Sequence, residues 1–580
     1  MKAATRNLVR TAVRRLGSSL SNLIYVTRRK SLTDNLSVIS SQEQPRARSN
    51  QKVLRDLKKV KKKTKRDTSD NTSKENLNFL EVQEAIEVFN AKNSLNIDIN
   101  QVSNPSEIID TFLFSKKRPE IIIPNLEIVY QTFEGNGIGI IPKSMYITPF
   151  TESEEHIFNK FTVVQVPKTV VGDKVNVKLA LHTRYYAEGV LQEVIFSKKS
   201  VRNNDLIVCN KFDECNGCQL QMMTYDDQLK FKESVIKKAY KFFYPELLNQ
   251  SIGSVYGSPM EYSYRNKITP HFKYPRVRRN HDDVIDLDEP TITDIKIGMQ
   301  HINPTKGMVD IDHCEIATPI INEQLLKKRL EIQNSLENIP AHKQGRQQTL
   351  FLRESLVIDN NTGNHSRTCI SESKNKVITE KVEDFVFQFE PSGFFQNNNH
   401  ILPLVLDYMR YHIGDYSYKY LIDTYCGSGF FGISLSKDIA KEGKIFGIEL
   451  AELSIKYATH NAKLNGLKVP EQIQFIEGNS ESLFKNDEFL RSGITGDESI
   501  VIMDPSRKGS NISFMKQLLE FKPKLIIYVS CNAFTQARDL GDFFELQGTN
   551  NEYKVRDLVG FDFFPQTKHV ETVAVIERIG

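Results

Sequence analysis

From about residue 386 to the end of the chain, short apolar runs alternate with stretches whose apolar residues have helical spacing. Apolar runs end near 423, 449, 503 and 530, and another begins at 571. This alternation of strand and helix predicts an α/β fold with a mainly parallel sheet. We therefore expect a Rossmann-like domain in which the ends of several strands meet at one edge.

A different pattern covers residues 121–196, where short β-rich runs are separated by turns rich in Gly and polar residues. Five short strands in about 75 residues predict a small closed barrel of the OB type. Because such barrels present aromatic and basic side chains to nucleic acids, Arg184, Tyr185 and Tyr186 are candidate RNA contacts. The predicted strands are 126–131, 138–142, 161–167, 173–181 and 189–196.

The rest of the chain gives weaker patterns. Residues 78–92 and 228–243 have the spacing of amphipathic helices, and residues 200–385 mix helices and strands without a simple period. A chain of 580 residues is too long for a single core. We predict a disordered basic tail (1–77), a helical extension (78–118), a β-barrel (119–198), a mixed α+β central domain (199–385) and the Rossmann-like domain (386–580).

Charge is distributed unevenly along the chain. Residues 1–66 contain 19 Lys/Arg and three Asp/Glu, whereas the rest contains 58 Lys/Arg and 69 Asp/Glu. The folded part is therefore acidic. It could bind RNA only through local basic patches, because its net charge does not attract phosphate groups. No apolar run is long enough for a membrane-spanning helix, so we expect no membrane partner.

The basic tail contains two candidate signals. Residues 1–33 hold eight Lys/Arg and no Asp or Glu, and they can form an amphipathic helix, which predicts a mitochondrial transit peptide. The alternative is a disordered basic arm. The run KKVKKKTKR at 58–66 indicates a nuclear signal or an RNA-binding arm, and a solvated linker explains it equally well. We expect a mitochondrial protein, with the nucleus or cytoplasm as the alternative.

A Gly-rich turn follows the strand that ends near 423. Gly427 and Gly429 in DTYCGSG let the backbone turn sharply and approach a ligand closely. Glu449 ends the next strand, where a carboxylate can accept hydrogen bonds from both ribose hydroxyls of an adenosine ligand. The turn lacks the full dinucleotide spacing and no phosphate-binding Lys follows it. S-adenosylmethionine, which has no phosphate, suits it better than NAD or ATP, and an ordinary tight βα turn is the alternative.

Other polar residues lie at the ends of the later strands. Asp504 follows one strand in VIMDPSRKG, and Cys531 follows the next in LIIYVSCN, at the edge where open α/β sheets bind ligands. His569 and Glu571 precede the last strand, and Gln396 lies upstream of the sheet. A single Cys at a strand end is more often a buried apolar residue. Beside these motifs a nucleophile is the better interpretation, since a thiolate attacks strongly once its pKa is lowered.

Three cysteines lie close together in CNKFDECNGC, with the spacing C-x5-C-x2-C. Cys209, Cys215 and Cys218 therefore predict a metal site, for which Cys314 is the best candidate fourth ligand. Zinc and an iron–sulfur cluster both accept four thiolates. Unligated thiols are the alternative.

The motifs FFQNNNH, DTYCGSG, GIEL, DPSRKG, YVSCN and DFFPQTKHVE, in this order and spacing, resemble the RNA uridine-5-methyltransferase family, in particular its fungal tRNA (uracil-5-)-methyltransferases. The resemblance covers about residues 120–580 and implies a class I S-adenosylmethionine-dependent methyltransferase domain. It implies that Cys531 is the nucleophile and Glu571 the base. Residues implied to hold the cofactor are Gln396, Tyr425, Glu449 and Asp504. One departure is Ser506, where the family usually has a second proline, so we expect altered loop rigidity and retained chemistry.

Two further resemblances concern the N-terminal half. The sequence EGNGIG followed by VVGDKV resembles a TRAM domain, a small RNA-binding barrel attached to RNA-modifying enzymes. The cysteine spacing followed by GCQLQ resembles that of family members that bind a [4Fe–4S] cluster. Methyl transfer needs no such cluster, so its role would be structural or in RNA binding.

The implied reaction explains the residue types. Uracil C5 is a poor nucleophile, and addition of Cys531 to C6 produces an enolate whose C5 attacks the methyl group. Glu571 then removes the C5 proton, and a donor such as Arg507 would stabilise the enolate oxygen. The target base must leave its stack to reach these groups.

Three functions agree with these motifs. The first is methylation of the T-loop uridine 54 of tRNA, the second is the same reaction on ribosomal RNA, and the third is non-catalytic binding or folding of RNA. Retention of both candidate catalytic residues argues against the third, and the tail and long insertions favour tRNA. We expect a monomer, because no repeat or heptad pattern indicates otherwise.

Overall fold

The computed structural model describes residues 70–99, 121–142, 161–182, 185–249, 252–275, 278–279, 285–286, 295–303, 306–340, 342–359, 361–372, 375–414 and 418–579. Contacts divide the chain into two units, Met1–Glu75 and Asn76–Gly580, and nearly all described residues belong to the second. The candidate targeting signals at 1–33 and 58–66 lie outside the described residues. The finer domain boundaries stay predictions.

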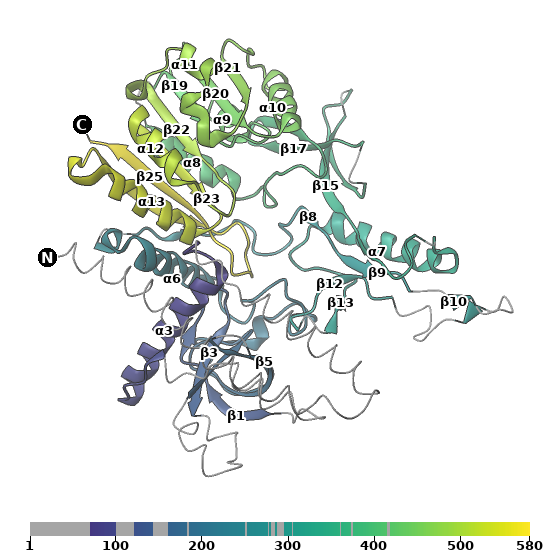
Figure 1. Cartoon of the computed structure of the whole chain (residues 1–580). Helices are drawn as coiled ribbons and strands as arrows, with labels where there is room; N and C mark the ends of the chain where they lie inside the picture. Colours follow the sequence, from purple (N-terminus) through teal and green to yellow (C-terminus); the bar gives the residue numbers. More distant parts are fainter. Residues whose placement is uncertain are drawn as a thin grey trace, which may run out of the picture. The chain divides into compact units, whose positions relative to one another are not determined.

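The C-terminal sheet has eight strands in the order β21-β20-β19-β22-β23-β25-β24-β7 (Figure 1). The five strands from β21 to β23 are parallel, β25 is antiparallel to β23 and to β24, and β7 joins the edge from a distant part of the sequence. The predicted α/β fold with a mainly parallel sheet is confirmed. The strands are β7 (Val255–Tyr256), β19 (Tyr420–Asp423), β20 (Lys444–Glu449), β21 (Ile473–Glu477), β22 (Ser499–Met503), β23 (Leu525–Ser530), β24 (Tyr553–Phe561) and β25 (Glu571–Arg578).

Helices cover both faces of this sheet because its strands are apolar on both sides. Alternate residues of β22 point to opposite faces: Val501 and Met503 belong to one buried cluster, and Ile500 and Ile502 to another. The first cluster includes residues of α6, α12 and α13, and the second includes residues of α8, α9 and α10. The helices are α6 (Tyr225–Phe243), α8 (Leu402–Ile413), α9 (Phe430–Ser434), α10 (Glu452–Leu464), α11 (Asp487–Arg491), α12 (Ile512–Phe521) and α13 (Ala533–Gln547).

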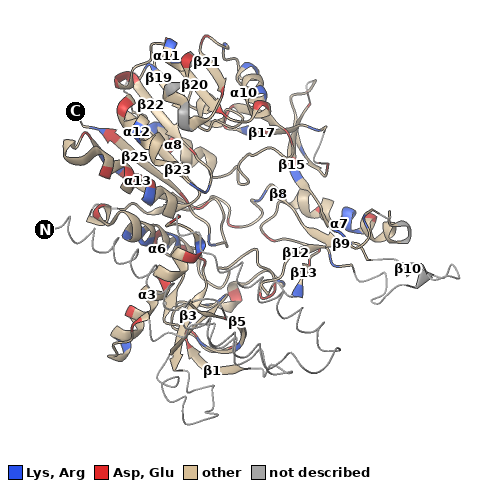
Figure 2. Ribbon diagram, in the orientation of Figure 1, with Lys and Arg blue, Asp and Glu red and all other residues tan. Residues whose placement is uncertain are grey.

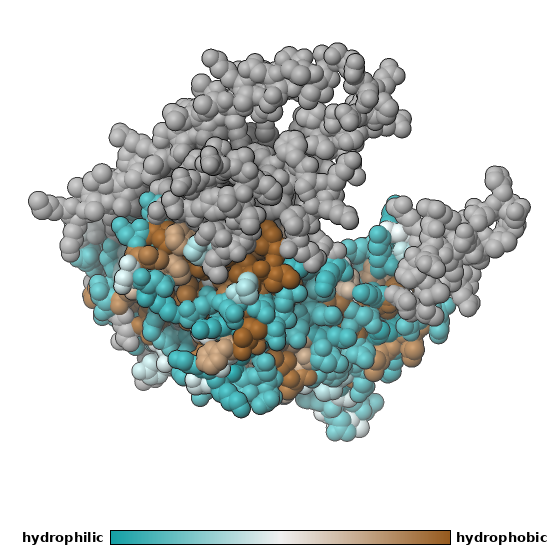
Figure 3. Space-filling model, turned by 90° about the horizontal axis from the view of Figure 1, so that it is seen from below, coloured by the Kyte–Doolittle hydropathy of each residue, from teal (hydrophilic) through white to brown (hydrophobic). Residues whose placement is uncertain are grey.

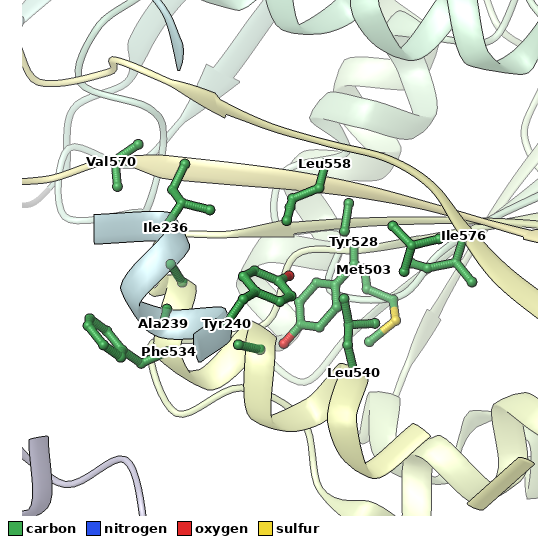
Figure 4. Close-up of a cluster of buried hydrophobic side chains, with 14 of the residues drawn as sticks. Ile236, Ala239, Tyr240, Met503, Tyr528, Phe534, Leu540, Leu558, Val570 and Ile576 are labelled. Atoms are coloured by element: carbon green, nitrogen blue, oxygen red, sulfur yellow. The ribbon is translucent and has the colours of Figure 1, made fainter. Parts of the chain in front are cut away.

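Helix α6 precedes the sheet in the sequence but packs into its core. It contains the predicted helix 228–243, and its residues Ile236, Ala239 and Tyr240 lie beside Leu540 of α13 and Tyr528 of β23 (Figure 4). Its N-cap is Thr224, whose side chain accepts a hydrogen bond from the backbone of the first turn. The core of the C-terminal sheet is therefore completed by a segment from the N-terminal half.

The predicted short strands of the N-terminal half form a six-stranded sheet in the order β1-β5-β6-β4-β3-β2. Strands β4 and β6 are parallel, and the other pairs are antiparallel. Because β1 and β2 are consecutive parts of one extended run, a sheet that has them at its two ends closes on itself. The strands are β1 (Ile122–Glu127), β2 (Tyr130–Gln131), β3 (Gly137–Pro142), β4 (Phe161–Val166), β5 (Lys174–His182) and β6 (Ala187–Phe196). The predicted helix 78–92 is α3 (Lys74–Asn93).

After α6 and β7, the described part of the central region combines small antiparallel sheets with helix α7, as the mixed pattern predicts. The sheets have the orders β13-β12-β9-β14, β16-β15-β8, β17-β18 and β10-β11. The elements are β8 (Lys267–Ile268), β9 (His271–Lys273), β10 (Arg278–Arg279), β11 (Ile285–Asp286), β12 (Gly298–Gln300), β13 (Met308–Asp310), α7 (Pro319–Asn334), β14 (Gln347–Thr349), β15 (Leu352–Ile358), β16 (His365–Ile370), β17 (Ile378–Val382) and β18 (Phe385–Phe389).

Charged residues of both signs occur along most of the described elements. Lys and Arg lie among Asp and Glu along most elements, with several lysines on α6 (Figure 2). On the face drawn in Figure 3, hydrophobic groups are separated by hydrophilic residues. None of the described helices is both long enough and apolar enough to cross a membrane.

Candidate active site

The carboxyl ends of the parallel strands bring most of the predicted site residues to one edge of the sheet. Asp504 follows β22, Cys531 follows β23, and Glu449 is the last residue of β20. Glu571 reaches the same edge because β25 is antiparallel and begins there. Since Ser530 pairs with Thr572, Cys531 and Glu571 are neighbours across the two strands.

The thiol of Cys531 lies in a partly buried, acidic environment. Burial raises its pKa to about 12, and the negative charges of Glu571 and Asp504 act in the same direction. The Arg507 guanidinium opposes them through its charge and through a hydrogen bond to the thiol. The thiol is therefore protonated at neutral pH, and Arg507 is the group that favours the thiolate.

Glu571 is buried, and its carboxyl group is poised to titrate near neutral pH. Its pKa is raised to about 8, mainly by burial and also by the charge of Asp504, while the Arg507 guanidinium acts in the opposite direction. Burial also raises the pKa of Asp504 to about 7. A carboxylate with such a pKa is a suitable general base, because it accepts a proton readily and is partly ionised at neutral pH.

His569, which the sequence places beside Glu571, is unsuited to carry a proton. Burial lowers its pKa to about 3, and the positive charges of Lys568, Arg507 and other nearby basic residues act in the same direction. The imidazole is therefore neutral over the physiological range. Between the two residues, Glu571 is the better candidate base.

The predicted adenosine-binding edge is formed by the turn after β19 and the end of β20. The Glu449 carboxylate accepts hydrogen bonds from the backbone N–H groups of Gly427 (3.2 Å) and Ala451 (3.0 Å). Gly427 has a φ of +53°, and no atom lies within 4 Å of the position that a Cβ would take. A ligand can therefore approach the Gly427 backbone closely. The half-buried Glu449 carboxylate beside it can accept further hydrogen bonds, as the ribose hydroxyls of S-adenosylmethionine require.

Sequence reasoning missed Asp423, the last residue of β19. It is fully buried, accepts a hydrogen bond from the Gly432 N–H (3.1 Å), and has its pKa raised to about 7 by burial, with Asp504 and Glu449 adding to the effect. The sequence does contain the relevant pattern, because Asp423 is an acidic residue at the end of an apolar strand, as Glu449 is. Three carboxyl groups at one edge suit a ligand that carries a sulfonium and an ammonium charge.

Gln396 lies in a segment that the central region holds in place. The guanidinium of the fully buried Arg353 donates to the carbonyl oxygens of Pro391 (3.3 Å), Gly393 (2.9 Å) and Phe395 (3.2 Å). The Asn266 N–H donates to the Asn397 carbonyl (3.0 Å), and the Asn398 amide to the Phe563 carbonyl (3.1 Å). The segment around Gln396 is therefore tied to the loop that leads to Glu571.

The loop 504–510, which carries Asp504 and Arg507, is fixed by the start of α13. The Asn532 side chain donates to the Arg507 carbonyl (3.0 Å), and Arg538 donates to the carbonyl of the next residue (2.7 Å). The Ser510 N–H donates to the Asp539 carboxylate (2.7 Å). Because α13 begins just after Cys531, these bonds place Arg507 beside the thiol.

The other residues of this loop agree with that arrangement. The Ser510 hydroxyl lies 3.1 Å from the hydroxyl of Tyr425, so the predicted cofactor residue Tyr425 contacts the loop. The carbonyl of Ser506 accepts a hydrogen bond from the Gly509 N–H (2.8 Å), and the Ser506 side chain is exposed. Contacts from α13 thus hold the loop that carries Ser506 in place of the family's second proline. The expected change in loop rigidity stays a prediction.

Comparison with known proteins decides the family. A family model described as tRNA (Uracil-5-)-methyltransferase matches residues 364–579. The tRNA (uracil(54)-C(5))-methyltransferase of Saccharomyces cerevisiae is 32% identical over 525 residues, which cover 83% of this chain and 77% of that protein. The chain belongs to the tRNA (uracil-5-)-methyltransferase family.

A second relative supports this membership, and a solved structure shares the fold. The tRNA (uracil(54)-C(5))-methyltransferase of Schizosaccharomyces pombe is 34% identical over 463 residues, covering 78% of each chain. The crystal structure of the Pyrococcus abyssi tRNA (uracil-54, C5)-methyltransferase with S-adenosyl-L-homocysteine has a TM-score of 0.53 at 20% identity and covers 78% of this chain and 99% of that one. At this identity the structural likeness shows the fold.

This member of the tRNA (uracil-5-)-methyltransferase family fixes the loop before Glu571 with a buried ion pair. Lys232 of α6 and Asp562 are both fully buried and form a salt bridge, and Lys232 also donates to the Phe564 carbonyl (3.1 Å). Gln228 of α6 exchanges two hydrogen bonds of 3.0 Å with Gln566. Helix α6 therefore sets the path of residues 562–566 toward the candidate base.

Replacement of Lys232 by Met should destabilise the protein strongly. It leaves the Asp562 carboxylate buried without its cationic partner, a change that costs about 3–5 kcal/mol of unfolding free energy. Denaturant unfolding followed by circular dichroism measures the loss. The matched control is Lys230→Met on the same helix, because Lys230 pairs with Asp227 but is 73% exposed, so its loss should change the unfolding free energy far less. Equal effects of the two variants would contradict the role of the buried pair.

The four cysteines predicted as metal ligands lie in one region of the structure. The Cys218 thiol interacts electrostatically with Cys314, Cys215 and Cys209, and burial raises the pKa of both Cys218 and Cys314, the latter to about 11. Lys168 donates to the carbonyl oxygens of Cys215 (2.9 Å) and Cys218 (2.7 Å). Within the described part of the chain, no three His, Cys, Asp or Glu side chains are placed to hold a metal ion. The metal site stays a prediction.

The candidate active site is located by its chemistry and not by the size of a cavity. A groove of about 850 Å³ lies between α3, α6 and the barrel, where Tyr130 and Phe231 are among the lining residues. Neither Cys531 nor Glu571 lines it. The edge of the C-terminal sheet, and not this groove, is therefore the site to which a function is assigned.

Proposed function

We propose that the protein transfers a methyl group from S-adenosylmethionine to C5 of uridine 54 in the T-loop of tRNA. The observation that carries the proposal is the position of Cys531 and Glu571, each one residue beyond the Ser530–Thr572 pair of β23 and β25, at the edge where Glu449 and Asp504 also lie. A nucleophile and a base on neighbouring strands can act on C6 and C5, which are adjacent atoms of one pyrimidine ring. Membership of the family, whose relatives are named for this reaction, supports the same substrate.

The site residues account for each step at the base. Cys531 loses its proton and adds to C6, which moves the C5–C6 π electrons toward O4 and makes C5 nucleophilic. Bound S-adenosylmethionine supplies an electrophilic methyl group for C5. Glu571 then takes the C5 proton, the double bond re-forms, and the Cys531 thiolate leaves.

Arg507 has two functions in this scheme. Its guanidinium hydrogen-bonds to the Cys531 thiol and lowers its pKa, which favours formation of the thiolate. Its position beside the nucleophile also suits a donor to the enolate oxygen, where negative charge develops. Because the nucleophile and the base sit at a partly buried sheet edge, the target uridine must leave its stack to reach them.

The proposal is tested with the full-length protein and two tRNA transcripts. Incubation with S-adenosylmethionine and an unmodified tRNA should give 5-methyluridine, measured by mass spectrometry of the digested nucleosides. A transcript with cytidine at position 54 is the matched control and should give none. Methylation of ribosomal RNA fragments but not of tRNA would favour the alternative substrate, and no 5-methyluridine in either RNA would overturn the proposal.

The barrel is proposed to be a TRAM domain that binds the RNA substrate. Its closed sheet with one parallel pair of strands and its EGNGIG turn support this assignment. Tyr185 and Tyr186 are half-buried, and both pack partly against the α3 side of the barrel, which limits their availability for stacking. Weaker tRNA binding after Tyr185→Ala, measured by filter binding, would support a direct contact, and unchanged binding would exclude it.

The four-cysteine region is proposed to hold a [4Fe–4S] cluster, with zinc as the alternative. The support is the sequence spacing together with the electrostatic interactions of Cys218 with the other three thiols. Bound to these residues, the cluster would cross-link the segment 209–218 to Cys314. Anaerobic purification followed by iron, sulfide and zinc analysis distinguishes the two metals, and a metal-free protein with full activity would refute both.

The cellular location is proposed from the basic tail alone. The acid-free segment 1–33 supports import into mitochondria, and the run at 58–66 supports the nucleus as the alternative. A fusion of residues 1–40 to a fluorescent reporter tests import directly. A monomer is proposed as well, which sedimentation of the purified chain tests.

A further inference from the structure

The turn between β2 and β3 of the barrel lies against both catalytic segments. Its residues 132–136 are closed by hydrogen bonds between Thr132 and Asn136 (2.8 Å) and between Gly135 and Thr132 (2.9 Å). Gly135 has a φ of +75°, and a Cβ there would lie 3.2 Å from the Gln219 side chain. The turn is therefore packed against the protein and not free in solvent.

The first contact of the turn reaches the segment after the nucleophile. The ring of Phe133 meets the ring of Phe534 edge-on, with 4.9 Å between centroids. Phe534 is buried, lies three residues after Cys531, and stands at the edge of the cluster drawn in Figure 4. Asn532 caps α13 by accepting a hydrogen bond from the Phe534 N–H. The position of Phe534 thus determines how α13 begins after Cys531.

The second contact reaches the segment before the base. Glu134 forms a salt bridge of 2.9 Å with Lys568, and the side chains are 15% and 24% exposed. Lys568 lies three residues before Glu571, and its backbone N–H donates to the Gln219 side chain (3.2 Å). Most water is excluded from this pair, so its charges are less screened than those of a surface pair.

The turn is also anchored on its other side. The Phe133 N–H donates to the carboxylate of Glu81 in α3 (2.6 Å), and Glu81 is buried in a salt bridge with Lys238 of α6 (2.8 Å). The turn therefore has a fixed support from which it can hold the two catalytic segments. A turn that only closed the barrel would need neither contact.

From these contacts we infer that residues Phe133 and Glu134 are positioning residues of the methyl-transfer site. They hold the segments that carry Cys531 and Glu571 at the separation that attack and proton removal require. The inference rests on the proposed roles of those two residues. It gives the EGNG turn of the barrel a function in catalysis that is separate from any contact of the barrel with RNA.

A double-mutant cycle tests the inference. In the full-length protein, Glu134→Gln and Lys568→Met should each lower kcat for tRNA methylation about tenfold, while KM for tRNA stays within about twofold. The double variant should be no slower than the slower single variant, because both remove one interaction. Lys568→Arg should restore most of kcat, since it keeps the positive charge.

Controls separate positioning from other effects. Glu127→Gln removes a barrel carboxylate that pairs with Lys92 in an exposed salt bridge, and it should leave kcat unchanged. Phe133→Leu, which keeps an apolar side chain, provides a second test if Glu134→Gln lowers the unfolding midpoint. Independent, multiplicative effects of the two substitutions, or a change in KM for tRNA alone, would overturn the inference. Cys531→Ala in the same assay tests the proposed chemistry separately. If this variant retains activity, the proposed function is wrong, and not only the positioning role of Phe133 and Glu134.

Discussion

Cys531→Ala should abolish methyl transfer while leaving the protein folded and able to bind its cofactor. Without the thiol no adduct forms at C6, so C5 stays too weakly nucleophilic to accept a methyl group, and kcat should fall by about 10⁴-fold or more. The thiol is partly buried and contacts the Arg507 side chain, so its removal leaves only a small void. Single-turnover methylation of tRNA with labelled S-adenosylmethionine measures the loss.

A second readout follows the covalent bond itself. RNA that carries 5-fluorouridine at the target position cannot lose a C5 proton, so the wild-type protein should stay attached to it as a band of low mobility in a denaturing gel. Cys531→Ala should give no such band. Cys369→Ala, at a half-buried cysteine of β16, is the matched control and should form the adduct normally. An adduct with Cys531→Ala would show that another group attacks C6.

The C-terminal sheet and most of the candidate site were predictable from the sequence because they depend on local patterns. Strands β19, β20, β22 and β23 are short apolar runs, and Glu449, Asp504 and Cys531 all occur where such a run ends. Parallel strands share one carboxyl edge, so residues at those positions must lie near one another. Asp423 has the same position on β19, and attention to every strand end would have found it.

The contacts that hold these residues in place were not predictable, because they join distant segments. Lys232 and Asp562 are 330 positions apart, and Lys568 and Glu134 are 434 apart. The apolar spacing of α6 correctly predicts a helix but does not show that one of its lysines is fully buried, since most lysines on such helices face water. A buried lysine is revealed only when its partner on another element is known.

Glu571→Gln should stop the reaction after methyl transfer and leave the RNA covalently attached to Cys531. The amide cannot remove the C5 proton, so the C5–C6 double bond cannot re-form and the thiolate cannot leave. Multiple-turnover activity should fall by about 10²–10⁴-fold, while one methyl group per protein is still transferred. Denaturing gels should show a slow band that contains both the RNA and the label from the methyl group. Glu577→Gln, on the same strand but paired with Lys554, is the matched control and should turn over normally.

The pH dependence supplies an independent check on the same residue. Burial raises the pKa of Glu571 to about 8, and the residue acts as a base only when it has lost its proton. For the wild-type protein, the rate at which the methylated adduct breaks down should therefore rise with pH and level off above about pH 8, because a larger fraction of the carboxyl group is ionised. In the Glu571→Gln variant, breakdown of the adduct should stay slow and lack this rise, since the amide does not titrate. A variant that turned over at the wild-type rate, or kept the same pH profile, would show that a different group removes the C5 proton.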